Sequence, residues 1–376
     1  MILENLRLDG FRNLQDVSLT FGRTANVIAG ANGQGKSNLL EAIGFLSVFR
    51  SFRTAYDAEI ARFDIDNFVI EGIFDSGSAL NHEVHVRYKK GVGKKVIVDA
   101  EPVSRLSSVV GFFPTICLGI EQFPIITGGP RERRRFLDMA LSQMSPLYLS
   151  ALMRYKRAVH QRNSLLSSGD DSVLRSDLPS WDAILVESGV EVIAGRNRFL
   201  EQLQAPAQVV YQAITGNEDT VPLNIRYRPD IKPDKDIRET FVKRLERDRP
   251  KELLQRRSLA GPHRDDFLIQ IGDRGLRKHG SQGEQKSALF ALKMAEMQLL
   301  QDLKNFTPTV LIDDLFSMLD HTRVSGTLQA IREAAQVFIT TTDGDSAVHQ
   351  LRQAGFSPDA IARYNVHNGV VTRETV

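Results

Sequence analysis

The sequence predicts an α/β protein in which a mostly helical second lobe is inserted into a domain built from both ends of the chain. Short apolar runs alternate with helical periodicity in the first hundred residues and again after residue 258. Between them the apolar spacing is helical over long stretches, and no heptad repeat is sustained, so no long coiled coil is expected. We therefore assign residues 1–110 and 258–376 to the first domain, whose two parts share one sheet, and residues 111–257 to the inserted lobe.

The first hundred residues are predicted to form strands around one helix. Alternating polar and apolar positions are typical of a half-buried strand, and a short run that is apolar throughout is typical of a fully buried one. The helix follows a glycine-rich turn, and the last strand pair is a hairpin that turns at Gly91–Gly93. The predicted strands cover residues 16–22, 25–30, 68–74 and 82–103, and the predicted helix covers residues 36–49.

The middle of the chain is predicted to contain three long helices, at 131–144, 146–166 and 180–204. The stretch at 167–180, rich in Ser, Asp and Gly, is predicted to be a polar loop between the last two helices. After "GPHRDDFLIQIGDRG" the alternation of strands and helices returns. It predicts helices at 283–302 and 322–335, strands at 309–314 and 336–342, and a closing strand pair.

Composition and charge exclude several classes of protein. The 48 Lys and Arg residues nearly balance the 46 Asp and Glu residues, which gives a net charge of +2. A surface that binds a polyanion would therefore have to be a local cluster of basic residues. Cys117 is the single cysteine, which excludes an intrachain disulfide and an all-cysteine metal site, and its apolar neighbours favour a buried, inert thiol. No apolar run approaches the roughly 20 residues that span a bilayer, and the acidic N-terminus is unlike a signal peptide. We expect a cytoplasmic protein without membrane contact.

A phosphate-binding loop is predicted at residues 30–37. The stretch "GANGQGKS" matches the pattern G-x-x-x-x-G-K-[ST], with an apolar run before it and helical periodicity after it. Its backbone N–H groups would surround the α- and β-phosphates of ATP, Lys36 would reach the β/γ oxygens, and Ser37 would bind Mg²⁺. The residues expected to bind the nucleotide here are Gly30, Ala31, Asn32, Gly33, Gln34, Gly35, Lys36, Ser37 and Asn38.

An apolar strand that ends in two acids is the expected partner of this loop. "TVLIDD" supplies such a strand, with Asp313 and Asp314 at its end. Asp313 would hold Mg²⁺ through water, and Asp314 would face the γ-phosphate and orient or deprotonate the attacking water. The alternative for Asp314 is a residue that only caps the following turn.

A serine turn opens the helix that precedes this strand. "SQGEQKSALFALK" places Ser281 and Gly283 where the first N–H groups of a helix form an anion site. A phosphate loop, then Ser-x-Gly-[Glu/Gln] at a helix start, then a strand with two acids is the order of an ABC-type P-loop ATPase head. In that architecture the serine turn of one subunit caps the γ-phosphate held by the other, so we expect Ser281 and Gly283 to act in trans within an ATP-dependent homodimer. Taken alone, the serine turn would be an ordinary helix N-cap.

Several stretches along the chain match the pattern of one family. They are "FRNL" at 11–14, "GANGQGKSNLLEAI" at 30–43, "SFRT" at 51–54, "GGPRERRRFLD" at 128–138, "QRNSLL" at 161–166, "AGPHRDDF" at 260–267, "GSQGEQKSALFALKMAE" at 280–296 and "LIDDLFSMLD" at 311–320. The succession of the last three is the most specific. Through these stretches the chain resembles the RecF family of bacterial recombination mediators over nearly its whole length.

The resemblance implies an ATPase head related to those of chromosome-maintenance proteins, with ATP and Mg²⁺ as cofactors. It implies a weak ATPase that works as a switch, with Lys36 and Asp314 acting in one chain and Ser281 and Gly283 in the other. The family binds DNA with ATP, works with the partner RecR and loads recombinase at gaps in damaged DNA. We therefore expect a nucleoid-associated protein that binds single- or double-stranded DNA regardless of sequence.

Polar residues near the predicted nucleotide site leave alternatives open. The resemblance implies that Arg12 and Asn13 line the edge of the nucleotide, although as single residues they are equally typical of a polar surface. Arg50 and Arg53, just after the phosphate-loop helix, fit a phosphate contact and a solvated loop equally well. The Pro-Glu-Asp that the family has before Gly-Gly-Pro is reduced to Glu121, which leaves open whether Gln122 senses the γ-phosphate.

Two further family stretches have open roles. His263–Asp266 fits a salt-bridged turn before a strand, whereas the resemblance implies a role at a dimer or lobe junction. "SMLD" stands where the family has Ser-Glu-Leu-Asp, so Ser317 and Asp320 are kept, and Met318 is expected to change only an interface contact.

A local basic cluster is the predicted DNA surface. Between residues 130 and 163, eight Lys and Arg residues stand against two acidic residues, a net charge of +6. The stretch 226–257 has twelve Lys and Arg residues and seven Asp and Glu residues, and such mixed charge is more typical of a solvated helix face. Phosphate contacts bind DNA without reading its sequence. The residues predicted to make them are Arg133, Arg134, Arg135, Lys156, Arg157 and Arg162.

Two other functions fit parts of the pattern. An energy-coupling ATPase subunit of an ABC membrane transporter would carry a sensor histidine after the strand "QVFIT", where this chain has Thr341, Thr342 and Asp343. The basic helical lobe also argues against a transporter. A small-molecule P-loop kinase would need neither Ser281 nor a dimer. The leading prediction is an ATP-switched DNA-binding dimer.

Overall fold

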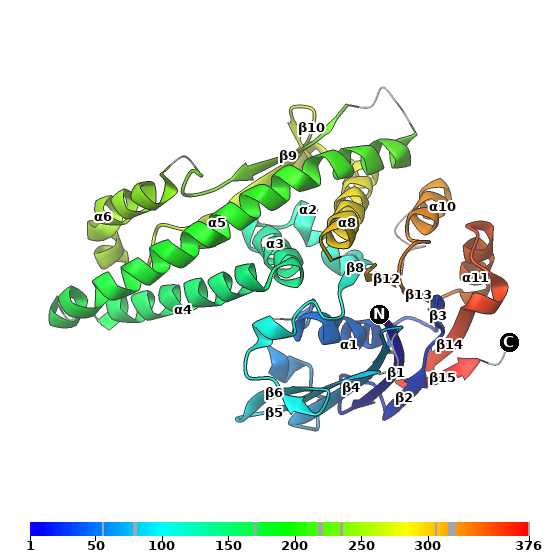
Figure 1. The fold of residues 1–376 in the computed structure, drawn as a ribbon. Helices are drawn as coiled ribbons and strands as arrows, with labels where there is room; N and C mark the ends of the chain where they lie inside the picture. The colour runs from blue at the N-terminus through cyan, green and yellow to red at the C-terminus, as the bar shows by residue number, and fades with distance from the viewer. Residues whose placement is uncertain are drawn as a thin grey trace. The chain divides into compact units, whose positions relative to one another are not determined.

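The structure is a computed structural model of the full chain, and its fold is described for residues 1–54, 56–77, 81–168, 171–216, 221–233, 236–304, 307–314 and 321–374. The chain forms two compact units, whose elements are labelled in Figure 1. The first unit comprises Met1–Phe123, Val209–Thr220 and Gln282–Val376, and the second comprises Pro124–Gln208 and Val221–Ser281.

The boundaries of these units fall later in the chain than the predicted boundaries at 110/111 and 257/258. Strand β8 (Thr115–Gly119) pairs with a strand of the first unit, although it lies beyond residue 110. Strand β10 (Asp266–Ile271) pairs with β9 (Leu223–Arg228) in the second unit, although it lies beyond residue 257. Local periodicity identifies a strand, but the sheet that the strand joins is decided by contacts with residues distant in sequence.

A six-stranded sheet in the first unit carries the phosphate loop. Its order is β15-β14-β3-β13-β12-β8, and its strands run parallel except β15, which is antiparallel to β14. Strand β3 comes from the N-terminal part of the chain and both of its neighbours from the C-terminal part, so the two ends share this mixed sheet as predicted. Its other bounds are β3 (Ala25–Ala29), β12 (Thr309–Asp313), β13 (Val337–Thr341), β14 (Ile361–His367) and β15 (Val370–Glu374).

A second six-stranded sheet corrects the prediction that the ends form a single sheet. All of its pairs are antiparallel, in the order β2-β1-β4-β5-β6-β7. The predicted hairpin is present between β5 and β6, where Gly91 and Gly93 have φ values of 77° and 99° that favour glycine. The strands are β1 (Ile2–Asp9), β2 (Val17–Thr20), β4 (Asn67–Asp75), β5 (His82–Lys89), β6 (Gly93–Val98) and β7 (Glu101–Pro102).

Helix α1 (Lys36–Val48) contacts strands of both sheets, namely β12 and β13 of the first and β4 of the second (Figure 1). Because it is covered on two sides, nearly all of its side chains are buried, and the helix lacks a polar face. Helix α8 (Gln282–Lys304) contacts β8, and α11 (Gly344–Gln353) contacts β3. These contacts fix the start of α1, and with it the phosphate loop, against the parallel sheet.

The helix predicted at 322–335 is shorter than expected. Helix α10 spans His321–Ala330 and is followed by turns. The N–H of Ala335 donates to the carbonyl oxygen of Pro308 at 3.1 Å, which directs the chain into β13 beside β12. The backbone thus leaves the helix to join the sheet while the sequence still has helical periodicity.

The second unit is mostly helical, as predicted. In Figure 1, α4 and α5 run side by side along much of their length. A three-stranded sheet in the order β11-β10-β9 completes the unit. The remaining bounds are α2 (Pro124–Thr127), α3 (Pro130–Met144), α4 (Pro146–Ser168), α5 (Asp171–Thr215), α6 (Ile237–Gln255), β11 (Arg274–Gly275) and α7 (Leu276–His279).

Helix α5 corrects the prediction of a polar loop at 167–180, because the chain is helical from Asp171 onward. Leu178 is buried against Leu166 and the partly buried Leu165 of α4. This contact explains why a segment with several Ser and Asp residues and a proline is helical, since tertiary packing overrides weak local propensity.

Two further expectations concern the membrane and the single thiol. Among the described residues, no helix combines the length and the apolarity needed to cross a bilayer. Cys117 lies on β8, and burial raises the pKa of its thiol to about 12. Since the thiolate is the reactive form, this agrees with the predicted inert thiol.

Candidate nucleotide-binding site

The predicted phosphate loop connects β3 to α1 in the first unit. Gly30 has a φ of 155°, and a Cβ there would lie 2.4 Å from the carbonyl oxygen of Val366 on β14. Gly33 has a φ of 78°, and no heavy atom lies within 4 Å of the position of its missing Cβ. The loop is therefore packed tightly at Gly30 and open at Gly33, where its backbone N–H groups can approach a phosphate.

The turn between β14 and β15 holds this loop in place. The N–H of Gly369 donates to the carbonyl oxygen of Gln34 at 3.0 Å, and the N–H of Asn368 donates to the Oε1 of Gln34 at 2.6 Å. A loop fixed by hydrogen bonds from another part of the sheet needs little rearrangement when an anion binds.

Lys36 is the first residue of α1 and is buried. Its Nζ donates to the carbonyl oxygens of Gly30 and Ala31, at 2.7 and 2.9 Å. Burial lowers the pKa of Lys36, and the carboxylates of Asp314 and Asp313 offset part of that effect. An additional anion at this point would favour the charged ammonium further.

The hydroxyl of Ser37 and the carboxylate of Asp313 lie together at the ends of α1 and β12. Ser37 Oγ donates to Asp313 Oδ1 at 2.9 Å, and Thr340 Oγ1 donates to the same oxygen at 2.6 Å. Thr340 is absent from the predicted site, although it stands opposite Asp313 in the register of β12 and β13. Two parallel strands that end side by side bring their last residues together, and this pairing of β12 with β13 would have indicated Thr340.

These oxygen donors fit Mg²⁺, which keeps several waters and takes one or two protein ligands besides phosphate oxygens. Ser37 and Asp313 supply one hydroxyl and one carboxylate. Within the described ranges there is no group of three or more His, Cys, Asp and Glu side chains that would favour a caged transition metal.

Asp314 follows β12 directly and has a φ of 53°, an unusual value for a residue other than glycine. Its N–H donates to Thr340 Oγ1 at 3.0 Å. Thr340 therefore accepts from Asp314 and donates to Asp313, which fixes the backbone at the point where the chain leaves the sheet.

Arg12 and Asn13 lie beside the phosphate loop, as the resemblance implies. Asn13 Nδ2 is 3.4 Å from the carbonyl oxygen of Gly33, and Asn38 Nδ2 donates to Asn13 Oδ1 at 2.7 Å. Arg53 is also held near the loop, because its Nη1 donates to Asn38 Oδ1 at 2.6 Å. The Arg53 side chain is anchored and yet 28% exposed, so a phosphate contact there stays a prediction.

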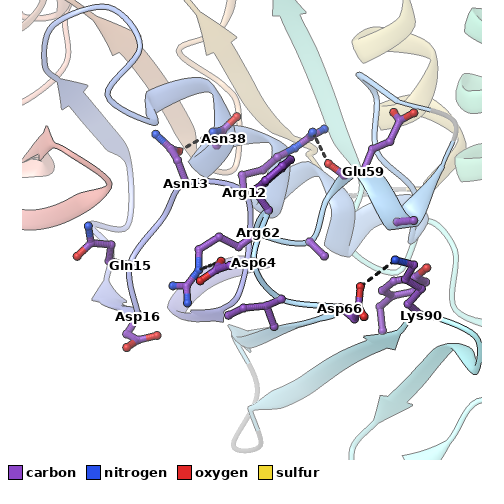
Figure 2. A pocket seen from close by; sticks show the side chains of 15 residues that line it. Arg12, Asn13, Gln15, Asp16, Asn38, Glu59, Arg62, Asp64, Asp66 and Lys90 are labelled. Atoms are coloured by element: carbon purple, nitrogen blue, oxygen red, sulfur yellow. Dashed lines mark hydrogen bonds and ion pairs between the residues drawn. The ribbon is translucent and has the colours of Figure 1, made fainter.

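A cavity of about 980 Å³ extends from these residues along the antiparallel sheet. Figure 2 shows the contacts between Asn13 and Asn38, between Arg62 and Asp64 and between Lys90 and Asp66. Both signs of charge line this cavity, together with the apolar surface of Phe63 and Tyr88. It can take a ligand with a flat ring and several hydrogen-bonding groups.

The serine turn and the segment before the second unit complete the predicted site. Ser281 ends the second unit, α8 begins at the next residue, and Gly283 lies in the first turn of α8. The predicted helix start is confirmed.

The segment before the second unit contains Glu121 and Gln122. Glu121 Oε1 lies 3.3 Å from Arg53 Nε, and Gln122 ends a short 3-10 helix. The "SMLD" stretch at 317–320 lies outside the described residues.

Two predicted DNA contacts are wrong. The Arg162 side chain is 0% exposed and donates to Asp182 and Glu252 at 2.6 and 2.9 Å. Arg133 is 5% exposed and binds both carboxylate oxygens of Asp266, at 2.6 and 2.9 Å. A buried guanidinium that is paired with carboxylates cannot reach a DNA phosphate, so Arg133 and Arg162 leave the predicted set.

The other four predicted DNA residues are at least partly accessible. Arg134 and Arg135 are half-buried, and burial lowers the pKa of Arg134. The Lys156 side chain is 52% exposed and donates to Asp138 at 2.9 Å. Arg157 is exposed and makes no ion pair with any residue that the structure describes. Asp138 is already counted in the +6 charge of this stretch, and acids from elsewhere in the unit reduce it further, among them Asp182, Glu252 and Asp266.

His263–Asp266 is a hydrogen-bonded turn in the second unit, in which Asp265 is buried and Arg264 is exposed. The ring Nδ1 of His263 lies 2.5 Å from the hydroxyl of Tyr155, and burial lowers the pKa of His263 to about 4. Asp265 accepts from Arg196 at 2.9 Å and from the hydroxyl of Tyr227 at 2.5 Å. This network ties helices α4 and α5 to β9, as expected of a salt-bridged turn before a strand, and a role at a dimer or lobe junction stays a prediction.

Comparison with known proteins agrees with this geometry. The family described as RecF/RecN/SMC N terminal domain matches residues 2–356. The chain is 37% identical over 363 residues to the DNA replication and repair protein RecF of Halalkalibacterium halodurans, which covers 94% of this chain and 96% of that protein. A solved structure described as the recombination mediator protein RecF-ATP in the RecFOR pathway has a TM-score of 0.88 at 30% identity, covering 100% of this chain and 98% of that one.

A more distant structure shares the fold alone. The Smc head domain derived from Pyrococcus furiosus has a TM-score of 0.54 at 14% identity and covers 100% of this chain. The predicted ATPase-head fold, a mixed sheet with helices and no long coiled coil among the described residues, is confirmed by these neighbours. The family match spans most of the chain, and the sequence identity exceeds 30% over nearly all of it. The chain belongs to the RecF family of DNA replication and repair proteins.

Proposed function

We propose that this chain is an ATP-switched, DNA-binding recombination mediator. The observation that carries the proposal is the grouping of Lys36, Ser37 and Asp313 at the phosphate loop of a RecF-family chain. The relative described as RecF-ATP supports ATP as the ligand. The alternative of a transporter subunit is not supported, because the matching family is one of DNA replication and repair proteins. At the position of a transporter's sensor histidine, Asp343 accepts from the N–H of Ser346 and caps α11.

The phosphates of ATP would lie on the loop between β3 and α1. Lys36 would exchange the carbonyl oxygens of Gly30 and Ala31 for β- and γ-phosphate oxygens, whose negative charge would offset the effect of burial on its pKa. Ser37 and Asp313 would hold Mg²⁺, which when bound neutralises charge on the β- and γ-phosphates. Thr340 keeps the Asp313 carboxylate in position.

The sugar and base of ATP would occupy the cavity beside the loop. Arg12, Asn13 and Asn38 line its near end and offer N–H and C=O groups for hydroxyls and phosphate oxygens. Phe63 and Tyr88, which line it as well, offer ring surface for the base. The position of Arg12 and Asn13 in the lining of this cavity supports the role at the nucleotide that the resemblance implies.

Asp314 would orient or deprotonate the water that attacks the γ-phosphate. It follows Asp313 at the end of β12, and its negative charge opposes the lowering of the Lys36 pKa by burial, which supports this role. Hydrolysis would then reset the complex, so that ATP works as a timer of DNA binding. Ser281 and Gly283 would complete the site in trans, in a homodimer that acts with a RecR-type partner and helps to load recombinase at DNA gaps.

Asp314→Asn is expected to keep ATP binding and to lower the rate of hydrolysis about 100-fold or more, because an amide cannot accept a proton from water. Phosphate release and equilibrium ATP binding are measured on the same sample. Asp343→Asn is the matched control, since this acid follows the neighbouring strand but caps α11. If Asp314→Asn hydrolyses ATP at the normal rate, Asp314 does not act on the attacking water and only caps the following turn.

The DNA contacts are proposed at Lys156 and Arg157 on α4, with Arg134 and Arg135 on α3 contributing from half-buried positions. Lys156→Gln with Arg157→Gln is expected to weaken DNA binding and to reduce the log–log salt slope by about two units, roughly one for each lost contact. Lys95→Gln changes the net charge in the same direction at an exposed position on strand β6 of the other unit, and should leave the slope unchanged. An unchanged slope in the double variant would place the DNA site elsewhere.

A further inference from the structure

Glu41 is a fully buried acid beside the phosphate loop. It lies on α1, and its side chain is 0% exposed. The carboxylate accepts two hydrogen bonds from one guanidinium, from Arg12 Nη2 at 2.8 Å and from Arg12 Nε at 3.0 Å. Burying a carboxylate is costly unless it is fully hydrogen-bonded, so a charged residue at this position needs an account beyond helix packing.

The same carboxylate also organises the loop that follows α1. The hydroxyl of Ser51 donates to Glu41 and accepts the N–H groups of Arg53 and Thr54, each at 2.9 Å. Arg53 Nη1 lies 3.4 Å from Glu41 Oε2. Glu41 thus holds one arginine directly and, through Ser51, shapes the turn that carries a second.

Both arginines are close to the phosphate loop, Arg53 through a series of hydrogen bonds and Arg12 through the cavity beside the loop. Arg53 donates to Asn38, Asn38 donates to Asn13, and Asn13 reaches the carbonyl oxygen of Gly33. Arg12 lines the cavity together with Asn13 and Asn38 (Figure 2). A chain of hydrogen bonds therefore connects the buried carboxylate to the part of the loop that is open to a phosphate.

The guanidinium of Arg12 keeps donors for a ligand. Three of its N–H groups are used within the chain, two by Glu41 and one by the carbonyl oxygen of Glu59 at 2.6 Å. Arginine carries two further N–H groups, and the side chain is 22% exposed. A guanidinium held at three points loses little conformational freedom when it binds an anion or a hydroxyl.

We propose that Glu41 is a positioning residue for the nucleotide, acting through Arg12 and, by way of Ser51, through Arg53. The proposal rests on the ATP site described under "Proposed function". It assigns to one carboxylate the placement of both guanidinium groups next to the loop. Glu41 itself is too deeply buried to touch the ligand, so its effect passes entirely through these arginines.

The test is a double-mutant cycle between Glu41→Gln and Arg12→Ala, read out as the Kd of the full chain for ATP with Mg²⁺. Glutamine keeps the size of the side chain but removes the charge and turns an amide N–H toward the guanidinium. We expect each single variant to raise the Kd roughly tenfold, the loss of about one charged hydrogen bond. We expect Glu41→Gln to raise the Kd by clearly less than tenfold in the Arg12→Ala background, because only the route through Ser51 and Arg53 is left.

Glu252→Gln is the matched control. Glu252 is also 0% exposed and also binds an arginine, Arg162 at 2.9 Å, but it lies in the second unit. This variant should lower the thermal stability and leave the Kd for ATP unchanged, which separates the loss of a buried charge from the loss of a positioned arginine.

Each other outcome overturns a distinct claim. An unchanged Kd in folded Glu41→Gln, or a full further loss in the Arg12→Ala background, overturns the positioning role while the nucleotide site stands. Failure of the wild-type chain to bind ATP overturns the proposed function itself. If Glu41→Gln does not fold, Arg12→Lys serves instead, because it keeps a charge beside Glu41 without the two-point contact. A wild-type Kd in Arg12→Lys then overturns the proposal, and a raised Kd supports it.

Discussion

Lys36→Met is expected to abolish the ATP-dependent activity of this chain, lowering hydrolysis about 100-fold or more. The ammonium of Lys36 is the cation that the structure places closest to the loop carbonyls of Gly30 and Ala31, where the β- and γ-phosphates would lie. Methionine has a similar length but no charge, so the negative charge that develops during phosphoryl transfer loses its fixed partner.

The measurement compares phosphate release and ATP binding in Lys36→Met with those in Lys94→Met. Lys94 is a suitable control because burial also lowers its pKa, and its Nζ donates to Asp57 at 2.8 Å on the antiparallel sheet side of the first unit. Lys94→Met should lower the melting temperature without changing hydrolysis. Wild-type ATP affinity and turnover in Lys36→Met would contradict the assignment of the site.

Ser281→Arg is expected to abolish ATP-induced dimerisation while leaving nucleotide binding to the single chain nearly intact. Lys36 and Ser37 begin α1 and Asp313 ends β12, all within the first unit of one chain, so the binding of the triphosphate would not require a second chain. The arginine side chain would fill the approach of the γ-phosphate to the start of α8 in the partner. Ser281→Ala is the milder variant and should weaken dimerisation without introducing bulk.

A mixture of two inactive variants gives a sharper form of this experiment. A dimer of Ser281→Arg with Lys36→Met has one composite site that carries both lesions and one that carries neither. If one intact site is enough, partial activity returns on mixing. If the mixture stays inactive although mixed dimers form, both sites must be intact for turnover. If the mixture stays inactive and Ser281→Arg alone dimerises fully with ATP, the two-chain site is contradicted and Ser281 is only a helix cap.

The parts of the site that follow from the sequence are those formed by contiguous residues. The phosphate loop, the helix after it and the strand that ends at Asp313 each have a local pattern, and the structure contains all three. Their meeting at one edge of the sheet follows as well, because parallel strands carry their C-terminal ends on the same side.

What the sequence did not indicate depends on pairing between distant residues. Thr340 matters only because β13 lies next to β12, and Glu41 matters only because Arg12 folds back onto α1. In the sequence, Glu41 is one acid in an apolar helix, and no local rule separates a buried carboxylate from an exposed one. A register between strands or an ion pair over 29 positions is needed to recognise either residue.

The basic cluster illustrates the same point with charge. Counting along 130–163 treats every arginine as available, but Arg133 and Arg162 are paired with acids more than 15 positions away in sequence. Such pairs form because a guanidinium is buried only when carboxylates satisfy it. Net charge in a sequence window therefore overstates the charge that the folded surface presents to DNA.

We propose that the γ-phosphate of ATP switches this chain from a monomer to a dimer. Light scattering on the wild-type chain measures the molecular mass and therefore tests this switch. A ligand shifts an equilibrium only through its different affinity for the two states, and the γ-phosphate is the difference between ATP and ADP. With Mg²⁺ present, we expect the mass of a dimer with ATP and of a monomer with ADP, and Asp314→Asn should hold the dimer longer than the wild type does. A chain that stays monomeric with ATP, or that dimerises equally with ADP, would contradict it.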